Sequence, residues 1–274
     1  MRLSPHITVM QNAALKAAKR LLRDFSEVEQ LQVSIKGPGD FVTQADLRAE
    51  ATLREELARA RPGYAFLMEE SGASGGDNWS WRWIVDPLDG TTNFLHGIPQ
   101  WAISIALQRR FSDGQTEIAA AIVYNPATNE MFWAEKGVGA FLNDRRLRVS
   151  ARRVMSEAVF STGIPFAKVQ EALRAPFLRV LTRLMPQVAG IRRFGAAALD
   201  LAWLAAGRYE GFWEIGLKPW DCAAGILLVK EAGGYVTTPE GQEISDFDQD
   251  VNVVAGNSHL HGPLRLTVLQ SLSE

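Results

Sequence analysis

Two carboxylates, Asp86 and Asp89, follow the apolar residues 83–85. The aromatic and β-branched residues of this run predict a buried strand, and Pro87 and Gly90 are expected to break it, so both acids should lie where it leaves the sheet. Strand ends are common ligand sites in sheet proteins. Because the Pro87 ring fixes φ, the spacer is stiff and both acids can face one cation. The same residue types also favour a simple turn, an alternative that this stretch alone leaves open.

A third acid, Glu69, follows another predicted strand over residues 64–68. If the two strands are neighbours, their carboxylates converge, and two like charges ~4 Å apart repel by about 4 kcal/mol at an effective dielectric constant near ~20. Such a cluster is tolerable only around cations. After Gly90, the N–H groups of Thr91 and Thr92 can open a helix, where exposed amides favour phosphate.

Two further acids, Asp46 and Asp221, can each be explained as a helix cap. Thr43 and Asp46 match a capping box at the start of a predicted helix, and from the spacing Asp46 is first a cap partner. Asp221 likewise stands at a predicted helix start, where aspartate stabilises a helix by about 1 kcal/mol without any ligand. The oxygen-rich set as a whole nevertheless suits Mg²⁺ or Mn²⁺ better than zinc or copper.

Composition narrows the class of protein. The chain has 274 residues, 47% of them hydrophobic, a formal net charge of −2 and one cysteine, Cys222. The charge does not indicate a strongly basic nucleic-acid surface, and a single cysteine excludes an intrachain disulfide and a thiolate-built zinc site. Without an apolar leader or a run of ~18 apolar residues, we expect a cytoplasmic protein outside the membrane.

Several other chemistries lack their motifs. The four histidines do not have metal-ligand spacing, and no nucleophile elbow, Walker-type phosphate loop or Cys-x-x-Cys occurs. The glycines at 137 and 139 lack the third glycine and helix of a dinucleotide site and are expected to form a turn.

Alternating patterns predict an α/β fold. We expect helices over residues 5–25 and 43–61, strands over 101–107 and 117–133 with a turn at 125–129, and a loop over 36–40. From about Ser150, helices alternate with single strands. The ranges expected there are strands at 159–163, 209–215 and 251–255, and helices at 167–185 (interrupted near Pro176), 195–206, 221–232 and 263–271. We place a boundary between two halves, 1–150 and 151–274.

Three separated motifs resemble the inositol monophosphatase family, in its bacterial branch. They are residues 86–94 (DPLDGTTNF) with Glu69-Glu70-Ser71 upstream, residues 220–225 (WDCAAG), and residues 197–202 (AALDLA). The segment from Asp40 to Asp46 and the Phe94-x-His96-x-x-Pro99 spacing fit as well, so the resemblance covers nearly the whole chain.

The resemblance implies a layered αβαβα sandwich of the inositol monophosphatase and fructose-1,6-bisphosphatase type. It also implies a homodimer and a lithium-sensitive, Mg²⁺-dependent hydrolysis of phosphate monoesters, with two or three ions per site and Mn²⁺ as a possible substitute. No membrane and no nucleic-acid partner is expected.

The resemblance also assigns roles to particular residues. The implied metal ligands are Glu69, Asp86, Asp89, Asp221 and the Leu88 carbonyl, with the Thr91 hydroxyl completing the shell. The implied catalytic residues are Asp46, Thr91 and Glu69, of which Asp46 and Thr91 orient and deprotonate a metal-activated water. Gly90 and Thr91 amides are expected to hold phosphate, Gly195, Ala196, Glu214 and Asp221 to line the substrate site, and Lys36 to lie in a mobile loop that closes on it.

Two departures and three alternatives accompany this prediction. Met68 stands where the family often has glycine, and Ala196 where a serine or threonine hydroxyl is usual. The leading substrate is myo-inositol 1-phosphate. The alternatives are a histidinol-phosphatase, another sugar or polyol phosphatase, and a regulatory protein that binds transcription or RNA machinery, for which Arg145-Arg146 and Arg152-Arg153 are the candidate surface. A bisphosphate substrate is disfavoured because its site needs additional cationic side chains, and the sequence offers only Arg192, Arg193 and Lys218 nearby.

Overall fold

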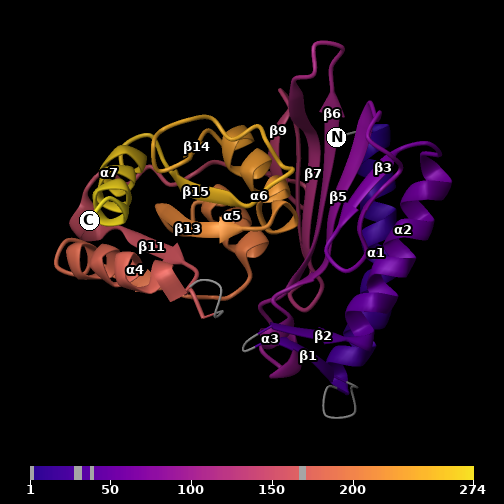
Figure 1. Cartoon of the computed structure of the whole chain (residues 1–274), viewed down its shortest axis with the longest axis horizontal. Helices are drawn as coiled ribbons and strands as arrows, with labels where there is room; N and C mark the ends of the chain where they lie inside the picture. Colours follow the sequence, from indigo (N-terminus) through magenta and orange to yellow (C-terminus); the bar gives the residue numbers. More distant parts are fainter. Residues whose placement is uncertain (1–2, 28–32, 38–39, 167–170) are drawn as a thin grey trace.

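The computed structural model describes residues 3–27, 33–37, 40–166 and 171–274; for residues 33–37 and 40–42 it describes the backbone only. The elements form five layers: two helices, an eight-stranded sheet, two helices, a five-stranded sheet and two helices (Figure 1). The predicted layered αβαβα sandwich is confirmed. None of the helices in the described part of the chain combines the length and apolar character needed to cross a membrane.

The outermost layer consists of α1 (Pro5–Ser26) and α2 (Gln44–Ala60), which cover one face of the larger sheet (Figure 1). Ser4 caps α1, because its Oγ accepts a hydrogen bond from the Ile7 N–H at 3.2 Å. The predicted capping box of Thr43 and Asp46 is present at the start of α2. Both helix starts therefore lie within a residue or two of where the sequence predicts them.

The larger sheet runs β10-β9-β8-β7-β6-β5-β3-β4. Its strands are β3 (Ala65–Met68), β4 (Gly72–Ser74), β5 (Trp81–Asp89), β6 (Ala102–Arg110), β7 (Thr116–Asn125), β8 (Glu130–Glu135), β9 (Gly139–Leu142) and β10 (Arg145–Arg146). β3 and β5 are parallel neighbours with Met68 opposite Val85. This register brings the ends of both strands, and the acids that follow, to one edge of the sheet.

The central layer consists of α5 (Ala197–Ala205) and α6 (Pro219–Glu231), between the two sheets (Figure 1). Their small side chains allow close contact: a Cβ at Gly225 of α6 would lie 2.4 Å from Leu201 Cβ of α5. Alternate residues of β5 divide between the layers, so Ile84 faces these helices while Trp83 and Val85 face α1 and α2.

The smaller sheet has the order β12-β11-β13-β15-β14, and α4 (Glu171–Leu184) and α7 (His261–Leu272) cover its outer face (Figure 1). Its strands are β11 (Val159–Thr162), β12 (Gly190–Arg192), β13 (Gly211–Leu217), β14 (Tyr235–Thr237) and β15 (Val251–Gly256). Trp213 and Val254 face the outer helices, whereas Phe212 and Val253 face α5 and α6.

Three short elements complete the chain. The hairpin of β1 (Val33–Gly37) and β2 (Asp40–Thr43) lies beside α3 (Thr91–Leu95), and a 3₁₀ turn spans Met155–Glu157 (Figure 1). The larger sheet draws its strands from residues 65–146 and the smaller from 159–256. One buried cluster nevertheless joins both sheets through the central helices. The division into halves 1–150 and 151–274 stays a prediction.

Three expectations about local structure were wrong. β5 does not break at Pro87 but runs to Asp89, with an irregularity in its pairing to β6 between Asp86 and Asp89 that accommodates the missing N–H. α4 is continuous through Pro176. Lys36, expected in a loop, belongs to β1, where antiparallel pairing with β2 orders the backbone. Residues 38–39 of that expected loop and 167–170 of the expected fourth helix lie outside the described residues.

Candidate active site

The parallel pair β3 and β5 delivers three of the predicted ligands. Glu69 directly follows β3, and its N–H donates to the Val85 carbonyl of β5 at 3.2 Å. Asp86 is buried, and its Oδ1 accepts a hydrogen bond from the Leu88 N–H at 2.8 Å. Asp89 ends β5 and is 9% exposed. The irregular pairing around Pro87 therefore places Asp86, Asp89 and the intervening Leu88 carbonyl at one end of a buried strand.

The second half contributes Asp221 from the first turn of α6. Its Oδ2 accepts the Lys218 N–H at 2.8 Å, so the helix-capping role expected from the sequence is present. The same carboxylate interacts electrostatically with Glu69, Asp86 and Asp89 from the first half. Asp221 therefore both caps α6 and belongs to the group of acids.

Burial raises the pKa of every member of this set, and repulsion from neighbouring carboxylates adds to the effect for Glu69, Asp86 and Asp221. Burial, followed by the charge of Asp221, raises the pKa of Glu69 to about 8. Burial, followed by the charge of Asp89, raises the pKa of Asp221 to about 7. The pKa of Asp86 lies well above its ordinary value because of burial and the neighbouring Glu69 carboxylate. Four carboxylates in this arrangement favour a bound cation, which stabilises all of their charged forms.

The donor set fits Mg²⁺ in its chemistry. All of the candidate ligands are oxygens, from four carboxylates and the Leu88 carbonyl, as a hard divalent cation prefers. Glu69 Oε2 is buried without a hydrogen-bond partner, so one acceptor of the set is left free. Among the described residues, no group of three or more Asp, Glu, His or Cys side chains is close enough together to hold a metal ion as it stands.

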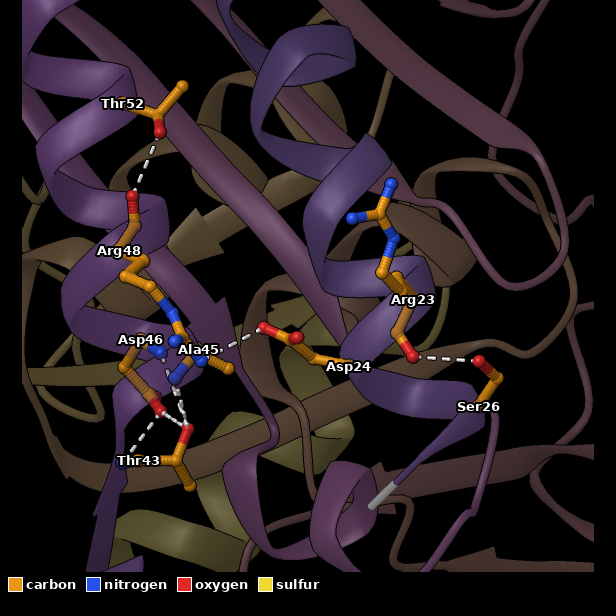
Figure 2. A network of polar contacts seen from close by, with 8 residues as sticks. All are labelled: Arg23, Asp24, Ser26, Thr43, Ala45, Asp46, Arg48 and Thr52. Carbon is orange, nitrogen blue, oxygen red and sulfur yellow. Dashed lines mark hydrogen bonds and ion pairs between the residues drawn. The ribbon is translucent and has the colours of Figure 1, made fainter. Parts of the chain in front are cut away.

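Asp46 lies beside these ligands, and hydrogen bonds from Thr43 and Thr91 fix its carboxylate. Its Oδ2 accepts hydrogen bonds from the Thr43 N–H at 2.9 Å and from the Thr43 hydroxyl, as Figure 2 shows. Its Oδ1 accepts from the Thr91 hydroxyl at 3.1 Å, and that hydroxyl also lies 3.1 Å from the Leu88 carbonyl. Burial raises the pKa of Asp46. Thr91 therefore connects Asp46 to the strand that carries the metal ligands.

Gly90 makes the turn between β5 and α3 possible. Its φ is +89°, and a Cβ would lie 2.9 Å from the Gln100 carbonyl oxygen and 3.1 Å from Ala196 Cβ. Asn93 in the following turn donates to the carbonyls of Gln100 and Phe194, each at 2.7 Å. These bonds fix the turn that carries Gly90 and Thr91 against the segment that leads into α5.

Asp89 also caps α5. Ala196, the N-cap residue, has no side-chain hydrogen bond to the helix. Asp89 Oδ2 instead accepts the Ala198 N–H at 2.8 Å, and hydrogen bonds from the first amides of α5 oppose the effect of burial that raises its pKa to about 6. Ala196 has no hydroxyl to offer as a cap, and the Asp89 carboxylate from β5 caps the helix instead.

Two of the candidate metal ligands, Asp89 and Asp221, line a cleft together with the predicted substrate residues. It is lined by the end of β5, the residues that follow β11, the segment that leads into α5 and its first turn, β13 and the first turn of α6: Asp89, Gly163, Ile164, Arg193, Gly195, Ala196, Ala197, Asp200, Glu214, Leu217 and Asp221. Glu214 lies against Gly163, where a Cβ would be 1.8 Å from Glu214 Oε1. Burial, followed by the charge of Asp221, raises the pKa of Glu214 to about 8. The structure therefore brings Gly195, Ala196, Glu214 and Asp221 together.

Sequence reasoning gave no site role to two polar members of this cleft, Arg193 and Asp200. Arg193 was noted only as a nearby cation. Asp200 appears in the sequence analysis only as part of the 197–202 motif. An acid among the alanines and leucines of a buried helix is the signal that could have indicated a site role. Lys36 belongs to the hairpin beside α3, but its side chain lies outside the described residues.

Comparisons with known proteins agree with this geometry. The model of the inositol monophosphatase family matches residues 2–273. The inositol-1-monophosphatase of Mesorhizobium japonicum is 51% identical, over 100% of this chain and 99% of its own. Nus factor SuhB of Pseudomonas aeruginosa is 41% identical, over 97% and 96% of the two chains. Among solved structures, extragenic suppressor protein suhB from Bartonella henselae superposes with a TM-score of 0.88 at 52% identity, over 97% of this chain and 98% of its own.

The match extends over the whole set of motifs that suggested the family and over both sheets that position them. The chain belongs to the inositol monophosphatase family.

Proposed function

We propose that this protein is a Mg²⁺-dependent inositol-1-monophosphatase. The observation that carries the proposal is the convergence of Glu69, Asp86, Asp89 and Asp221, from two strands and a helix, beside Asp46 and Thr91. Relatives with more than half of their residues identical bear the name inositol-1-monophosphatase. Phosphate monoester hydrolysis is among the slowest uncatalysed reactions, and positioned charge of this kind is what it requires.

Glu69, Asp86, Asp89, Asp221 and the Leu88 carbonyl are the residues that would hold two or three metal ions. Bound Mg²⁺, or Mn²⁺ in its place, supplies a Lewis acid that stabilises negative charge on phosphate and acidifies water. We also propose that lithium inhibits the enzyme, as the resemblance to the family implies.

The protein's own residues orient and deprotonate the attacking water. Asp46, whose two oxygens accept hydrogen bonds from Thr43 and Thr91, is a fixed carboxylate with acceptor capacity remaining. Thr91 Oγ1 lies 3.1 Å from Asp46 Oδ1 and 3.1 Å from the Leu88 carbonyl oxygen, so its hydroxyl can give its proton to Asp46 as it takes one from the water. In this proposal Asp46 is the final acceptor of the water proton, Thr91 orients the water, and Glu69, which directly follows β3, assists.

The remaining assignments concern the substrate. The Gly90 and Thr91 amides hold the phosphate, since both lie at the turn after Asp89. Gly195, Ala196, Glu214 and Asp221 line the cleft that receives the polyol. Lys36, on the hairpin beside α3, is the proposed member of a moving segment that closes over the phosphate.

A substrate panel tests the proposal. Purified protein with Mg²⁺ should release phosphate fastest from myo-inositol 1-phosphate, compared with histidinol phosphate, fructose 1,6-bisphosphate and 3′-phosphonucleotides. Addition of excess EDTA should abolish the activity, and Mg²⁺ should restore it. A preference for histidinol phosphate of about tenfold or more, about 1.4 kcal/mol in transition-state binding, would overturn the inositol assignment.

A second candidate function is a regulatory role in transcription or RNA metabolism. Five arginines between residues 145 and 153 are exposed, and those at 145, 148 and 153 have no acidic partner among the described residues: Arg145, Arg146, Arg148, Arg152 and Arg153. Relatives named Nus factor SuhB share about two fifths of the sequence. A catalytically dead Asp89→Asn protein that restores every phenotype of a deletion strain would favour this role.

A homodimer is also proposed. Large apolar side chains are exposed on and next to α4, with Leu178 59% and Met185 61% exposed. Two copies that bury these residues against each other would remove that surface from water. Sedimentation should show a dimer, and Leu178→Glu should shift it towards the monomer, whereas Leu266→Glu on α7 should not.

A further inference from the structure

Glu50 is a buried acid of α2 to which the proposed chemistry gives no role. It is 5% exposed, and its Oε2 accepts a hydrogen bond from the Glu70 N–H at 2.9 Å, across 20 residues of sequence. Burial of a carboxylate is costly unless strong hydrogen bonds compensate it, and a bond from a backbone N–H to a charged oxygen is one of these. Glu50 therefore holds the backbone directly after the candidate ligand Glu69.

Hydrogen bonds hold the backbone on both sides of Glu69. The Glu69 N–H donates to the Val85 carbonyl of β5 at 3.2 Å, and the next N–H, that of Glu70, donates to Glu50. Because each peptide group is planar, these bonds fix the orientations of the two planes that meet at the Glu69 Cα. The φ and ψ angles of Glu69 are then set, and with them the direction in which its side chain leaves the backbone.

The same face of α2 contacts this region at three successive turns. Residues four apart in a helix lie one above another, and this spacing occurs at Asp46, Glu50 and Arg54. Besides burial, the charge of Asp46 raises the pKa of Glu69, so these two carboxylates are within electrostatic reach. Arg54 donates to the Ser71 Oγ at 2.7 Å. One helix thus carries Asp46 and holds the turn that begins at Glu69.

We propose that Glu50 is a positioning residue for the Mg²⁺ site: by accepting the Glu70 N–H, it directs the Glu69 carboxylate towards the other ligands. The inference rests on the proposed function, since it names the group that orients one of the proposed ligands. Removal of the hydrogen-bond partners behind a metal ligand typically weakens metal binding by about 10- to 100-fold. Because Asp46 belongs to the same helix, the bond also fixes Glu69 relative to the proposed proton acceptor.

Two variants separate the hydrogen bond of Glu50 from its charge. Glu50→Gln keeps an acceptor oxygen at the same reach without the charge, whereas Glu50→Asp keeps the charge on a side chain that is one methylene shorter. Calorimetric titration with Mg²⁺ alone should give a Kd within about threefold of wild type for Glu50→Gln and about 10- to 100-fold higher for Glu50→Asp. A Glu50→Asp protein with the wild-type Kd, or a Glu50→Gln protein as impaired as Glu50→Asp, would overturn the inference.

Glu210 provides the matched control. It is also buried, and its Oε2 accepts a backbone N–H, that of Val159, at 2.8 Å, outside the group of candidate ligands. Glu210→Asp should therefore bind Mg²⁺ with the wild-type Kd, even if its melting temperature falls. If it loses as much affinity as Glu50→Asp, the loss reflects general destabilisation and Glu50 has no positioning role.

Hydrogen exchange of the Mg²⁺-free wild-type protein, followed by NMR, needs no variant. The Glu70 amide should exchange at least about tenfold more slowly than in an unfolded chain, because it is bonded to Glu50. Exchange at the rate of an unfolded chain contradicts the proposal. Failure of the proposed function is seen separately, as a wild-type protein that protects this amide but neither binds Mg²⁺ nor releases phosphate from myo-inositol 1-phosphate.

Discussion

The Asp89 carboxylate at the end of β5 caps α5: its Oδ2 accepts the Ala198 N–H at 2.8 Å, across 109 residues of sequence. Ala196, where a local cap would stand, has no hydroxyl to offer. The carboxylate proposed to hold metal therefore also joins β5 of the larger sheet to the central helix α5. Ser104 Oγ reinforces this contact by donating to the Trp220 carbonyl at 3.1 Å, next to Asp221.

Asp89→Asn should separate these two roles. An asparagine keeps one oxygen for the Ala198 N–H but loses the negative charge that a cation requires. We expect kcat to fall by about 10²-fold or more while the melting temperature stays within about 3 °C of wild type. Phosphate release and thermal unfolding measure the two effects, and a variant with normal kcat would remove Asp89 from the ligand set.

Ala196→Ser should partly replace the cap that Asp89→Ala removes. A serine at an extended N-cap position bonds the N2 or N3 amide, and such a cap contributes about 0.5–2 kcal/mol. The Asp89→Ala/Ala196→Ser protein should therefore be more stable to urea than Asp89→Ala alone, with no recovery of activity. Ala206→Ser at the other end of α5 is the control and should give no gain; equal gains from both serines would contradict the capping account.

Thr91→Val should impair catalysis by removing the hydroxyl between Asp46 and the Leu88 carbonyl. The loss of a group that orients a proton transfer costs about 10²- to 10⁴-fold in kcat. Thr91→Ser keeps the hydroxyl and should retain most of the activity. Thr52, whose hydroxyl donates to the Arg48 carbonyl within α2 (Figure 2), provides the matched control. A Thr52→Val protein as impaired as Thr91→Val would indicate a general effect on folding.

Local signals in the sequence predict most elements, because caps and periodicity act within a few residues. Ser4 and the Thr43–Asp46 capping box mark helix starts that the structure confirms. Pro87 and Pro176 misled the prediction, since tertiary pairing and packing accommodate a missing N–H at both positions. Short strands such as β12 and β14 carry too few residues for a pattern and went unpredicted.

The candidate site, like the fold, could be predicted only in part from local sequence signals. The strand-end acids Glu69, Asp86 and Asp89 were found because each follows a recognisable apolar run. The bond from Asp89 to Ala198 could not be predicted, because it depends on how the central helices dock between two sheets. No local pattern encodes that docking.

The metal-free protein should lose stability as pH rises. The folded pKa values of Glu69, Asp221 and Asp89, about 8, 7 and 6, lie above their ordinary values of 4.5, 3.8 and 3.8. Below pH ~4 these groups are protonated in both states and impose no penalty. Between pH ~4 and ~8 the unfolded chain releases its protons first, so the free energy of unfolding falls.

Mg²⁺ should counteract this loss, because it binds the charged carboxylates of the folded state. We expect Mg²⁺ to raise the melting temperature by roughly 5 °C or more at pH 8 and by much less at pH 5. Differential scanning calorimetry of EDTA-treated protein, with and without Mg²⁺, measures both effects. A stabilisation that is the same at both pH values would show that the ion binds elsewhere.

Gly163→Ala should displace Glu214 without unfolding the protein. A Cβ at this position would lie 1.8 Å from Glu214 Oε1 and 2.1 Å from its Cδ, so the carboxylate has to move. The clash involves the end of a flexible side chain, and the backbone of β11 can stay in place. If Glu214 contacts substrate hydroxyls, KM for myo-inositol 1-phosphate should rise by about tenfold, the equivalent of about one hydrogen bond.

The matched control for this variant is Gly262→Ala in α7, where a Cβ would meet nothing within 4 Å. It should leave KM unchanged and slightly stabilise the helix, since alanine has the higher helix propensity. Hydrolysis of p-nitrophenyl phosphate by Gly163→Ala should remain near the wild-type rate, because that substrate has no hydroxyl for Glu214 to bind. A rise in KM for both substrates would instead show that Gly163 shapes the phosphate and metal region, and Glu214 would lose its role in recognising the polyol.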